Sequence, residues 1–249
     1  MVLADVGMMA TALGMASGPW LRGLVFAHSV AYREPLRRRC PTCGVVAVVV
    51  AVRGVLAAAP VDGHCYLCEA PVGRAAGSVE WIATAVTVAL ALVAPSGWVL
   101  AAWSWTALLG IALAHIDLAV LRLPDVLTVA AGLGSLALLG AAAIATDNFG
   151  SLWQALAGGL GLGALYLLPI LSKTLGMGRG DGMLAVVVGV NVGWLGLDAL
   201  VTATVVTAAL AVVYTVAKLI RRQLRPTEHV AVGPFILLGA LVAIVQHAA

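Results

Sequence analysis

The chain is dominated by apolar segments long enough to cross a lipid bilayer, and this feature limits its fold more than any other. A membrane-spanning helix needs about 20 mostly apolar residues. The run from Gly182 to Ile220 is too long for one helix, and Asn191, Gly193, Gly196 and Asp198 are expected to break it into a short helix and a longer one. Eight crossings are therefore predicted. The spans are Val6–Val30, Ser78–Ala94, Trp98–Ile116, Val126–Thr146, Leu152–Leu171, two helices within Gly182–Ile220, and Val230–Gln246.

The composition excludes an ordinary soluble domain. Apolar residues make up 62% of the chain and charged residues 10%, and the mean hydropathy is +1.07. Soluble proteins carry about 25% charged residues. The predicted class is an all-α polytopic membrane protein surrounded by membrane lipid. The net charge of +3 does not indicate a nucleic-acid partner, because the basic residues are confined to particular loops. No Lys or Arg precedes Arg22, so the first apolar segment is expected to remain as a spanning helix rather than a signal peptide.

The distribution of basic residues predicts the orientation. If residues 32–77 lie in the cytoplasm, the cytoplasmic connections hold every Lys and Arg except Arg22, and the other side holds Asp5, Asp147 and Asp198. Such an excess of Lys and Arg marks the cytoplasmic loops of a protein of the inner or plasma membrane. Three parts are expected: a first transmembrane helix at 1–31, a cytoplasmic four-cysteine module at 32–77, and a transmembrane core at 78–249.

Four cysteines in two C-x-x-C pairs predict a metal site in that module. The pairs are Cys40-Pro41-Thr42-Cys43 and Cys65-Tyr66-Leu67-Cys68, with 21 residues between them. Four thiolates complete the tetrahedral shell of a structural zinc ion, and the reducing cytoplasm disfavours disulfides and a thiol oxidoreductase. The stretch Val45–Pro60 between the pairs is unexpectedly apolar, and we expect it to be a buried or membrane-hugging part of the module.

Two aspartates at the membrane edge are the candidate catalytic residues. Asp117 ends the third predicted span and Asp181 begins the sixth, so both are expected at the cytoplasmic boundary. An acidic residue beside hydrocarbon is costly and marks a functional site. Two neighbouring carboxylates share a proton and can act together as general base and general acid. Gly178 and Gly180 would let the backbone approach a substrate closely. Asp125 is expected to cap a helix, with a secondary role in binding.

These motifs resemble the type IV prepilin peptidases, a group of membrane aspartyl peptidases with a Gly-x-Gly-Asp motif. The paired cysteines match the family's zinc-type module, and the 64 residues from 117 to 181 match its usual separation. The ordered set is specific although each motif alone is weak. The four matching segments are the cysteine pairs, Asp117 with Leu123–Thr128, Gly178–Asp181, and Val232–Phe235.

The resemblance implies cleavage of prepilins or pseudopilins after a glycine, just before their apolar helix, on the cytoplasmic face. It assigns catalysis to Asp117 and Asp181. Members with four such cysteines typically also methylate the new amino terminus with S-adenosylmethionine. The chain departs from the family pattern at Met183, where a lysine is usual, at His28, where an asparagine is usual, and in lacking Asn-x-Pro between the cysteine pairs.

Two other functions compete with this interpretation. A proton- or cation-coupled transporter would use Asp117 and Asp181 as ion carriers, but it predicts carboxylates near the midplane and inverted repeats. A non-catalytic scaffold would use the cysteine module to bind partners.

The run Gly158–Gly163 lies in an apolar span with no strand before it, so it predicts close helix packing rather than a nucleotide loop.

Overall fold

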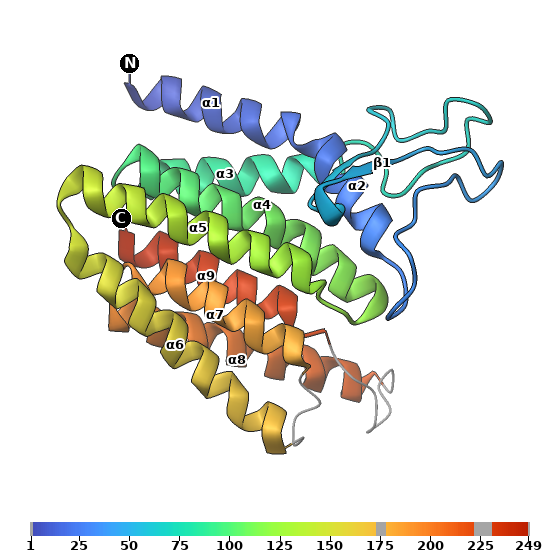
Figure 1. The fold of residues 1–249 in the computed structure, drawn as a ribbon. Coiled ribbons are helices and arrows are strands. Elements are labelled where there is room, and N and C mark those ends of the chain that lie inside the picture. The colour runs from blue at the N-terminus through green and yellow to red at the C-terminus, as the bar shows by residue number, and fades with distance from the viewer. Residues whose placement is uncertain (1, 173–177, 222–230, 249) are drawn as a thin grey trace.

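A computed structural model of the chain describes residues 2–172, 178–221 and 231–248. In that part the chain forms a bundle of roughly aligned helices, with the cysteine module at one end (Figure 1). The α-helices are α1 Val2–Ala16, α2 Gly18–His28, α3 Glu80–Val93, α4 Gly97–Val120, α5 Asp125–Thr146, α6 Phe149–Ser172, α7 Arg179–Gly193, α8 Leu197–Ile220 and α9 Gly233–Ala248.

Four of these helices are long and apolar enough to cross a membrane: α4, α5, α8 and the Phe149–Leu168 part of α6. The helices α3 and α9 are apolar but shorter. A mostly helical, multi-pass membrane protein is therefore confirmed, whereas the full count of eight crossings stays a prediction. The boundaries of α3 and α5 lie within two residues of the predicted spans.

The long apolar run does divide into two helices, α7 and α8, as predicted. The turn between them ends at Gly196, whose φ of +104° suits glycine. Asn191 was wrongly predicted to break the helix. It lies buried inside α7, where its Oδ1 accepts a hydrogen bond from Ser135 Oγ at 2.8 Å and its Nδ2 donates to the Val187 carbonyl at 2.8 Å. A hydrogen-bonded amide is tolerated in an apolar core, so Asn191 joins α7 to α5.

The Gly158–Gly163 run brings α6 against α7, as predicted. A Cβ at Gly158 would lie 2.6 Å from the Gly189 carbonyl oxygen, and one at Gly163 would lie 2.5 Å from Val186 Cγ2. Because only a glycine avoids these clashes, the run lets the two helices approach closely. The contact fixes the helix that carries Asp181.

A buried ion pair connects the first span to the module and to α3. The first apolar segment is broken between α1 and α2, with Pro19 in the first turn of α2. Arg22 is 1% exposed, and its Nε lies 2.9 Å from Glu80 Oε1. Its Nη2 donates to the Val61 carbonyl at 2.8 Å. The arginine inside the predicted span is therefore neutralised by a partner from α3, as a buried charge requires.

The module contains a short antiparallel hairpin, so the all-α prediction is wrong there. Strand β1, Val49–Ala51, pairs with β2, Leu56–Ala58, with Val50 opposite Ala57, and a 3₁₀ turn over Val52–Gly54 joins them. The hairpin packs against α2, where the Ala59 N–H donates to the Pro19 carbonyl at 2.9 Å. The apolar stretch Val45–Pro60 is thus a β-ribbon on the side of α2.

Candidate active site

Asp117 lies near the end of α4 and is 4% exposed. The helix continues to Val120, about one turn beyond its predicted end. Leu121 then takes the left-handed conformation at φ +51°, and its N–H donates to the Asp117 carbonyl at 2.8 Å. Leu123 and Pro124 carry the chain directly into α5. This tight turn folds α5 back beside α4, with Asp117 facing inward.

Asp181 occupies the third position of α7, at the same end of the bundle. One oxygen of its carboxylate, Oδ2, accepts a hydrogen bond from the Gly178 N–H at 2.9 Å. Gly178 precedes the helix, so this contact satisfies one of the N–H groups that a helix start leaves unpaired. The motif Gly178–Asp181 thereby holds the carboxylate at the beginning of the helix.

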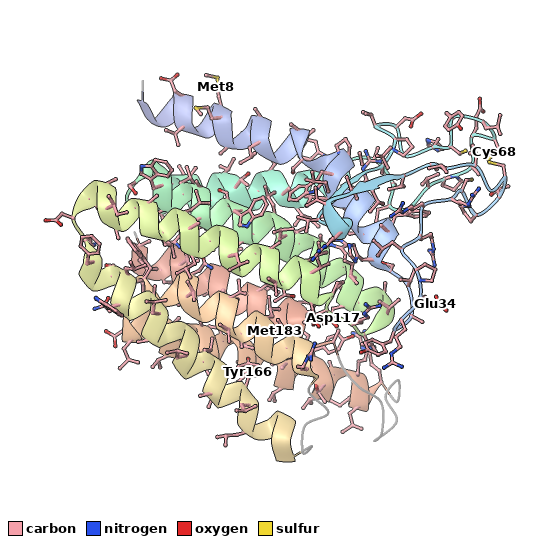
Figure 2. The ribbon with its side chains drawn as sticks, viewed as in Figure 1. Met8, Glu34, Cys68, Asp117, Tyr166 and Met183 are labelled. Atoms are coloured by element: carbon pink, nitrogen blue, oxygen red, sulfur yellow. The ribbon has the colours of Figure 1, made fainter. Side chains whose placement is uncertain are left out.

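The fold brings the predicted site residues together in one cavity of about 1110 Å³. Asp117, Asp125, Asp181, Gly178 and Gly180 all line it. The carboxylates of Asp117 and Asp181 are close enough to interact electrostatically. Figure 2 shows Asp117 at the end of the bundle that faces the module. Such a pair can share one proton, with one carboxyl group protonated while the other is ionised.

Gly233 is a site residue to which the sequence motifs assigned no role. It begins α9, and its N–H donates to Asp117 Oδ2 at 3.1 Å, across 116 positions of the chain. A Cβ at this position would lie 2.8 Å from the same oxygen. The positive end of α9 therefore points at the Asp117 carboxylate, which stabilises its charged form.

Asp125 has a role that differs from the predicted cap, whereas the predicted role of Gly180 in substrate approach stays a prediction. Asp125 is the first residue of α5 rather than its N-cap, and no side-chain capping hydrogen bond forms there. Its carboxylate pairs instead with Arg179 at the start of α7. Gly180 packs on the loop after α4, where a Cβ would lie 2.9 Å from Leu123 Cβ. Both contacts tie the Asp181 segment to the Asp117 segment.

The amino-terminal part supplies the opposite wall of the cavity, which the sequence did not reveal. His28, Tyr32 and Arg53 line it. The His28 Nε2 lies 2.9 Å from the Gly54 carbonyl oxygen, at the turn of the hairpin. Arg122 also lines the cavity and donates from Nη1 to the Ala31 carbonyl at 3.0 Å. The cavity that contains the carboxylates is therefore also lined by the cations Arg53 and Arg122.

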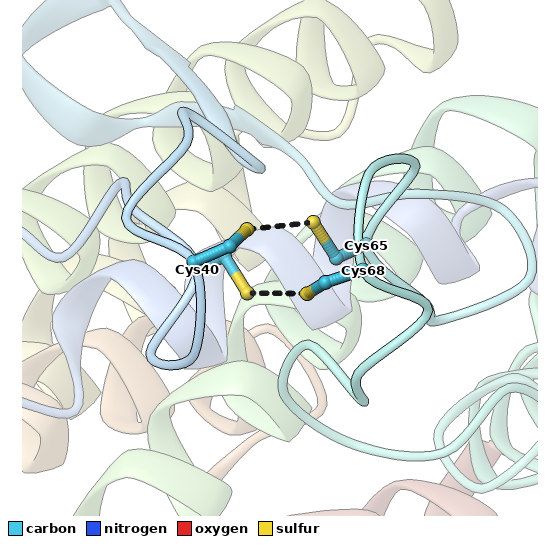
Figure 3. Close-up of side chains that lie close together, drawn as sticks. Cys40, Cys65 and Cys68 are labelled. Atoms are coloured by element: carbon cyan, nitrogen blue, oxygen red, sulfur yellow. Dashed lines mark hydrogen bonds between the residues drawn. The ribbon is translucent and has the colours of Figure 1, made fainter.

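The four cysteines form a second site within the module, and all four sulfurs lie within 4.8 Å of one another. Cys40 and Cys68 sulfurs are 3.6 Å apart, as are those of Cys43 and Cys65 (Figure 3). A tetrahedral zinc site with Zn–S bonds of about 2.3 Å has sulfurs about 3.8 Å apart. The donor set and spacing fit a four-coordinate metal ion.

The backbone prepares these thiols for a metal. Hydrogen bonds from the backbone N–H groups of Cys43 and Thr42 lower the pKa of the Cys40 thiol to about 6. Equivalent bonds from Leu67 and Cys68 lower the pKa of Cys65. Metal binding requires thiolates, so these hydrogen bonds favour the ligating form of Cys40 and Cys65.

Comparison with known proteins covers most of the chain. Residues 104–216 match the model of the type IV leader peptidase family. A prepilin leader peptidase/N-methyltransferase of Burkholderia pseudomallei (strain 1026b) is 34% identical over 214 residues, which cover 82% of this chain and 65% of that protein. A protein of the same name from Aeromonas hydrophila is 29% identical over 212 residues, covering 84% of this chain and 71% of its own length. No solved structure matches the chain.

The matched segment contains both catalytic candidates. Asp117 and Asp181 lie inside residues 104–216, and so does Asp125 with its partner Arg179. The cysteine pairs and Gly233 lie outside that segment. The segment that carries the paired aspartates therefore matches the type IV leader peptidase family.

Proposed function

We propose that the protein is a membrane aspartyl endopeptidase that removes the leader of prepilin-like proteins. The observation that carries this proposal is the meeting of Asp117 and Asp181 in one cavity, from the ends of two different helices. The chain spans 65% of the length of its Burkholderia relative, so the activity is argued from this site and from the matched segment. A carboxylate pair at the end of the bundle, rather than midway along it, favours a peptidase over an ion carrier.

The two aspartates divide the chemistry between them. The ionised carboxylate takes a proton from a water molecule as its oxygen attacks the scissile carbonyl carbon. The protonated carboxyl group donates its proton to the carbonyl oxygen, which gives a tetrahedral intermediate. As the C–N bond breaks, the first carboxyl group passes the proton taken from water to the leaving amine, and the second recovers its proton as the carbonyl forms again. The Gly233 N–H at 3.1 Å from Asp117 Oδ2 favours the ionised form at Asp117. The Gly178 N–H gives Asp181 Oδ2 the same support at 2.9 Å, so either carboxylate can hold the charge and the two act as one acid–base pair.

The substrate class is proposed from the family match, and the position of the cavity agrees with it. A membrane-edge site accepts a peptide bond just outside a spanning helix, as in prepilins and pseudopilins, whose leaders precede an apolar helix. We infer that the cavity faces the cytoplasm of an inner or plasma membrane, since the basic loops lie at that end. We keep the three proposed parts: 1–31 as a first span, 32–77 as the module and 78–249 as the peptidase core.

Labelling from one side of the membrane tests this orientation. Asp147, at the end of α5 opposite the cavity, and Tyr66, in the module, are both exposed. We expect a cysteine at Asp147 to react with an impermeant maleimide in intact cells and one at Tyr66 to react only after lysis. The parent protein, with its four native cysteines, sets the background. Reaction at Tyr66 in intact cells would reverse the assignment.

Two cofactors belong to the proposal. Zinc would be held by Cys40, Cys43, Cys65 and Cys68 with a closed shell that stabilises the module. The relatives' names include N-methyltransferase, and we propose that this chain too methylates the new amino terminus. S-adenosylmethionine would supply the methyl group for that reaction.

Co-expression with a candidate substrate tests the activity. A small protein with a basic leader, a glycine and an apolar helix would be produced with and without the enzyme in a host that lacks prepilin peptidases. Intact mass spectrometry is expected to show loss of the leader up to the glycine, and a further gain of one methyl group. Full-length substrate in the presence of folded enzyme would refute the peptidase assignment for that substrate class.

Substitution of Gly233 tests its contact with Asp117. Gly233→Ala places a Cβ 2.8 Å from Asp117 Oδ2, so the carboxylate must move. A displacement of about 1 Å can lower a rate by about 100-fold. We expect cleavage to fall by roughly 10- to 100-fold on that basis. Gly140→Ala is the matched control, since a Cβ there meets nothing within 4 Å. Equal rates for the two variants would remove Gly233 from the site.

A further inference from the structure

The hairpin of the module has an apolar face that no described part of the chain covers. Alternate residues of β1 and β2 point outward, and we call Val49, Ala51, Leu56 and Ala58, together with Val52 of the turn, the outer hairpin face. Val49 is 69% exposed, Val52 64% and Leu56 49%. The opposite face carries the half-buried Val50 and the buried Ala57 and packs on α2. In a solvated ribbon this outer face would be polar.

The hairpin lies beside the membrane-spanning helices rather than beyond them. The Trp20 Nε1 of α2 donates to the Val55 carbonyl in the hairpin turn at 3.0 Å. The Trp20 ring stacks on Trp105 with centroids 6.0 Å apart. The turn also carries Gly54, whose carbonyl oxygen lies 2.9 Å from His28 Nε2 at the end of α2, and Arg53, which lines the cavity together with Asp117. The hairpin therefore lies alongside the end of the bundle that carries the cavity, rather than beyond it.

Close backbone packing keeps the hairpin there. A Cβ at Gly23 would lie 2.8 Å from the backbone of Ala57, so β2 runs directly against α2. Figure 1 shows β1 beside α2, at the end of the bundle that carries the module. Because α2 covers the inner face of the hairpin, the outer hairpin face points away from the bundle, at a depth where lipid surrounds the protein.

Three arginines that precede the hairpin in the sequence lie on its cytoplasmic side. The Arg37 N–H donates to the Ala27 carbonyl near the end of α2 at 3.0 Å, and Arg38 and Arg39 continue the segment. All three arginines are exposed. The cysteines lie farther out, as the position of Cys68 in Figure 2 shows. From the membrane towards the cytoplasm, the order is therefore apolar residues, arginines and the cysteine cluster. This order is expected across the headgroup region of an anionic leaflet.

We propose that the outer hairpin face is inserted into the cytoplasmic leaflet, at the boundary between acyl chains and headgroups, and binds membrane lipid. The unpaired backbone groups at the hairpin edges require water or headgroups as partners, which places the hairpin at this boundary rather than in the bilayer centre. The proposal rests on the membrane placement of the bundle and not on the peptidase activity. Since the turn carries Arg53, which lines the cavity, lipid would anchor one wall of the proposed active site.

Fluorescence quenching in lipid nanodiscs tests this contact. A genetically encoded environment-sensitive fluorescent amino acid would be placed singly at Val49, Val52 and Leu56. The matched controls are Tyr66 and Leu67, which are 72% and 65% exposed but lie between Cys65 and Cys68 in the cysteine cluster. Lipids brominated near the ester end of the acyl chain are expected to quench the three hairpin positions several-fold more strongly than the two controls. Aqueous iodide is expected to quench the controls preferentially.

Each alternative has a distinct result. Iodide quenching of the hairpin positions equal to that of the controls would show that water covers the face and would overturn the proposal. Protection from both quenchers would mean that a second protein chain covers it, which would also overturn it. The measurement uses the whole chain and needs no substrate. Its result can therefore be interpreted even if the peptidase assignment is wrong.

Discussion

Replacing Asp117 or Asp181 with asparagine is expected to abolish cleavage of a co-expressed prepilin while the protein still inserts in the membrane. Asparagine keeps the shape of the side chain and its hydrogen bond from Gly233 or Gly178, but it cannot take up the proton of the attacking water or donate one as a carboxylic acid does. Positioned general acid–base groups contribute about 10²- to 10⁴-fold to a rate. We expect each variant to lose at least about 100-fold in initial cleavage rate, measured by mass spectrometry.

Two other aspartates serve as matched controls. Asp125→Asn removes the ion pair with Arg179 at the mouth of the cavity, so a partial loss is expected. Asp147→Asn changes an exposed residue at the end of α5 opposite the cavity and is expected to leave the rate unchanged. Near-normal cleavage by Asp117→Asn or Asp181→Asn, at matched membrane levels, would contradict the aspartyl mechanism.

The aspartate pair could be predicted from the sequence because each residue stands at the edge of a long apolar run. That position limits both carboxylates to one membrane boundary before any contact is known. The partner of Asp117 carries no such signal. Gly233 lies 116 residues away, and its contribution is a backbone N–H that every residue except proline possesses. The motif Val232–Phe235 marked the segment, but only the packing of α9 against α4 reveals its contact.

Local sequence rules failed where tertiary contacts supply a partner. Asn191 was expected to end a helix because a polar residue interrupts an apolar run, yet Ser135 of α5 satisfies its amide and α7 continues. Asp125 was expected to cap α5, but Arg179 across the cavity binds its carboxylate. The apolar stretch Val45–Pro60 was too short for a span and gave no period that distinguishes helix from strand. Its pairing as a hairpin depends on α2 beside it.

Removal of the metal is expected to unfold the module while leaving the hydrolytic chemistry to the aspartates. The cysteine sulfurs lie within 4.8 Å of one another, so four ligands close the shell and leave no position for an activated water. Purified protein should contain about one zinc per chain. The double substitution Cys40→Ser and Cys43→Ser should abolish the metal and expose the module to hydrogen exchange, since structural zinc contributes on the order of 10 kcal/mol to folding. His64→Ala, between the two pairs, is the matched control and should keep the metal, because His64 Nδ1 contacts the Asp62 carbonyl rather than the cluster.

Chelation of the purified enzyme then separates a structural from a catalytic metal. After chelator is added, we expect the cleavage rate to fall no faster than residues 40–68 unfold, with the unfolding followed by hydrogen exchange. Some loss of cleavage is expected because that segment adjoins a wall of the cavity. A metal that activates water would give a different time course, with hydrolysis stopping at once while the module stays protected from exchange. Recovery on adding zinc, with no change in exchange at any stage, would identify a metallopeptidase. In that case the roles assigned to Asp117 and Asp181 would be wrong, and the cysteine cluster would have to lie within reach of the scissile bond.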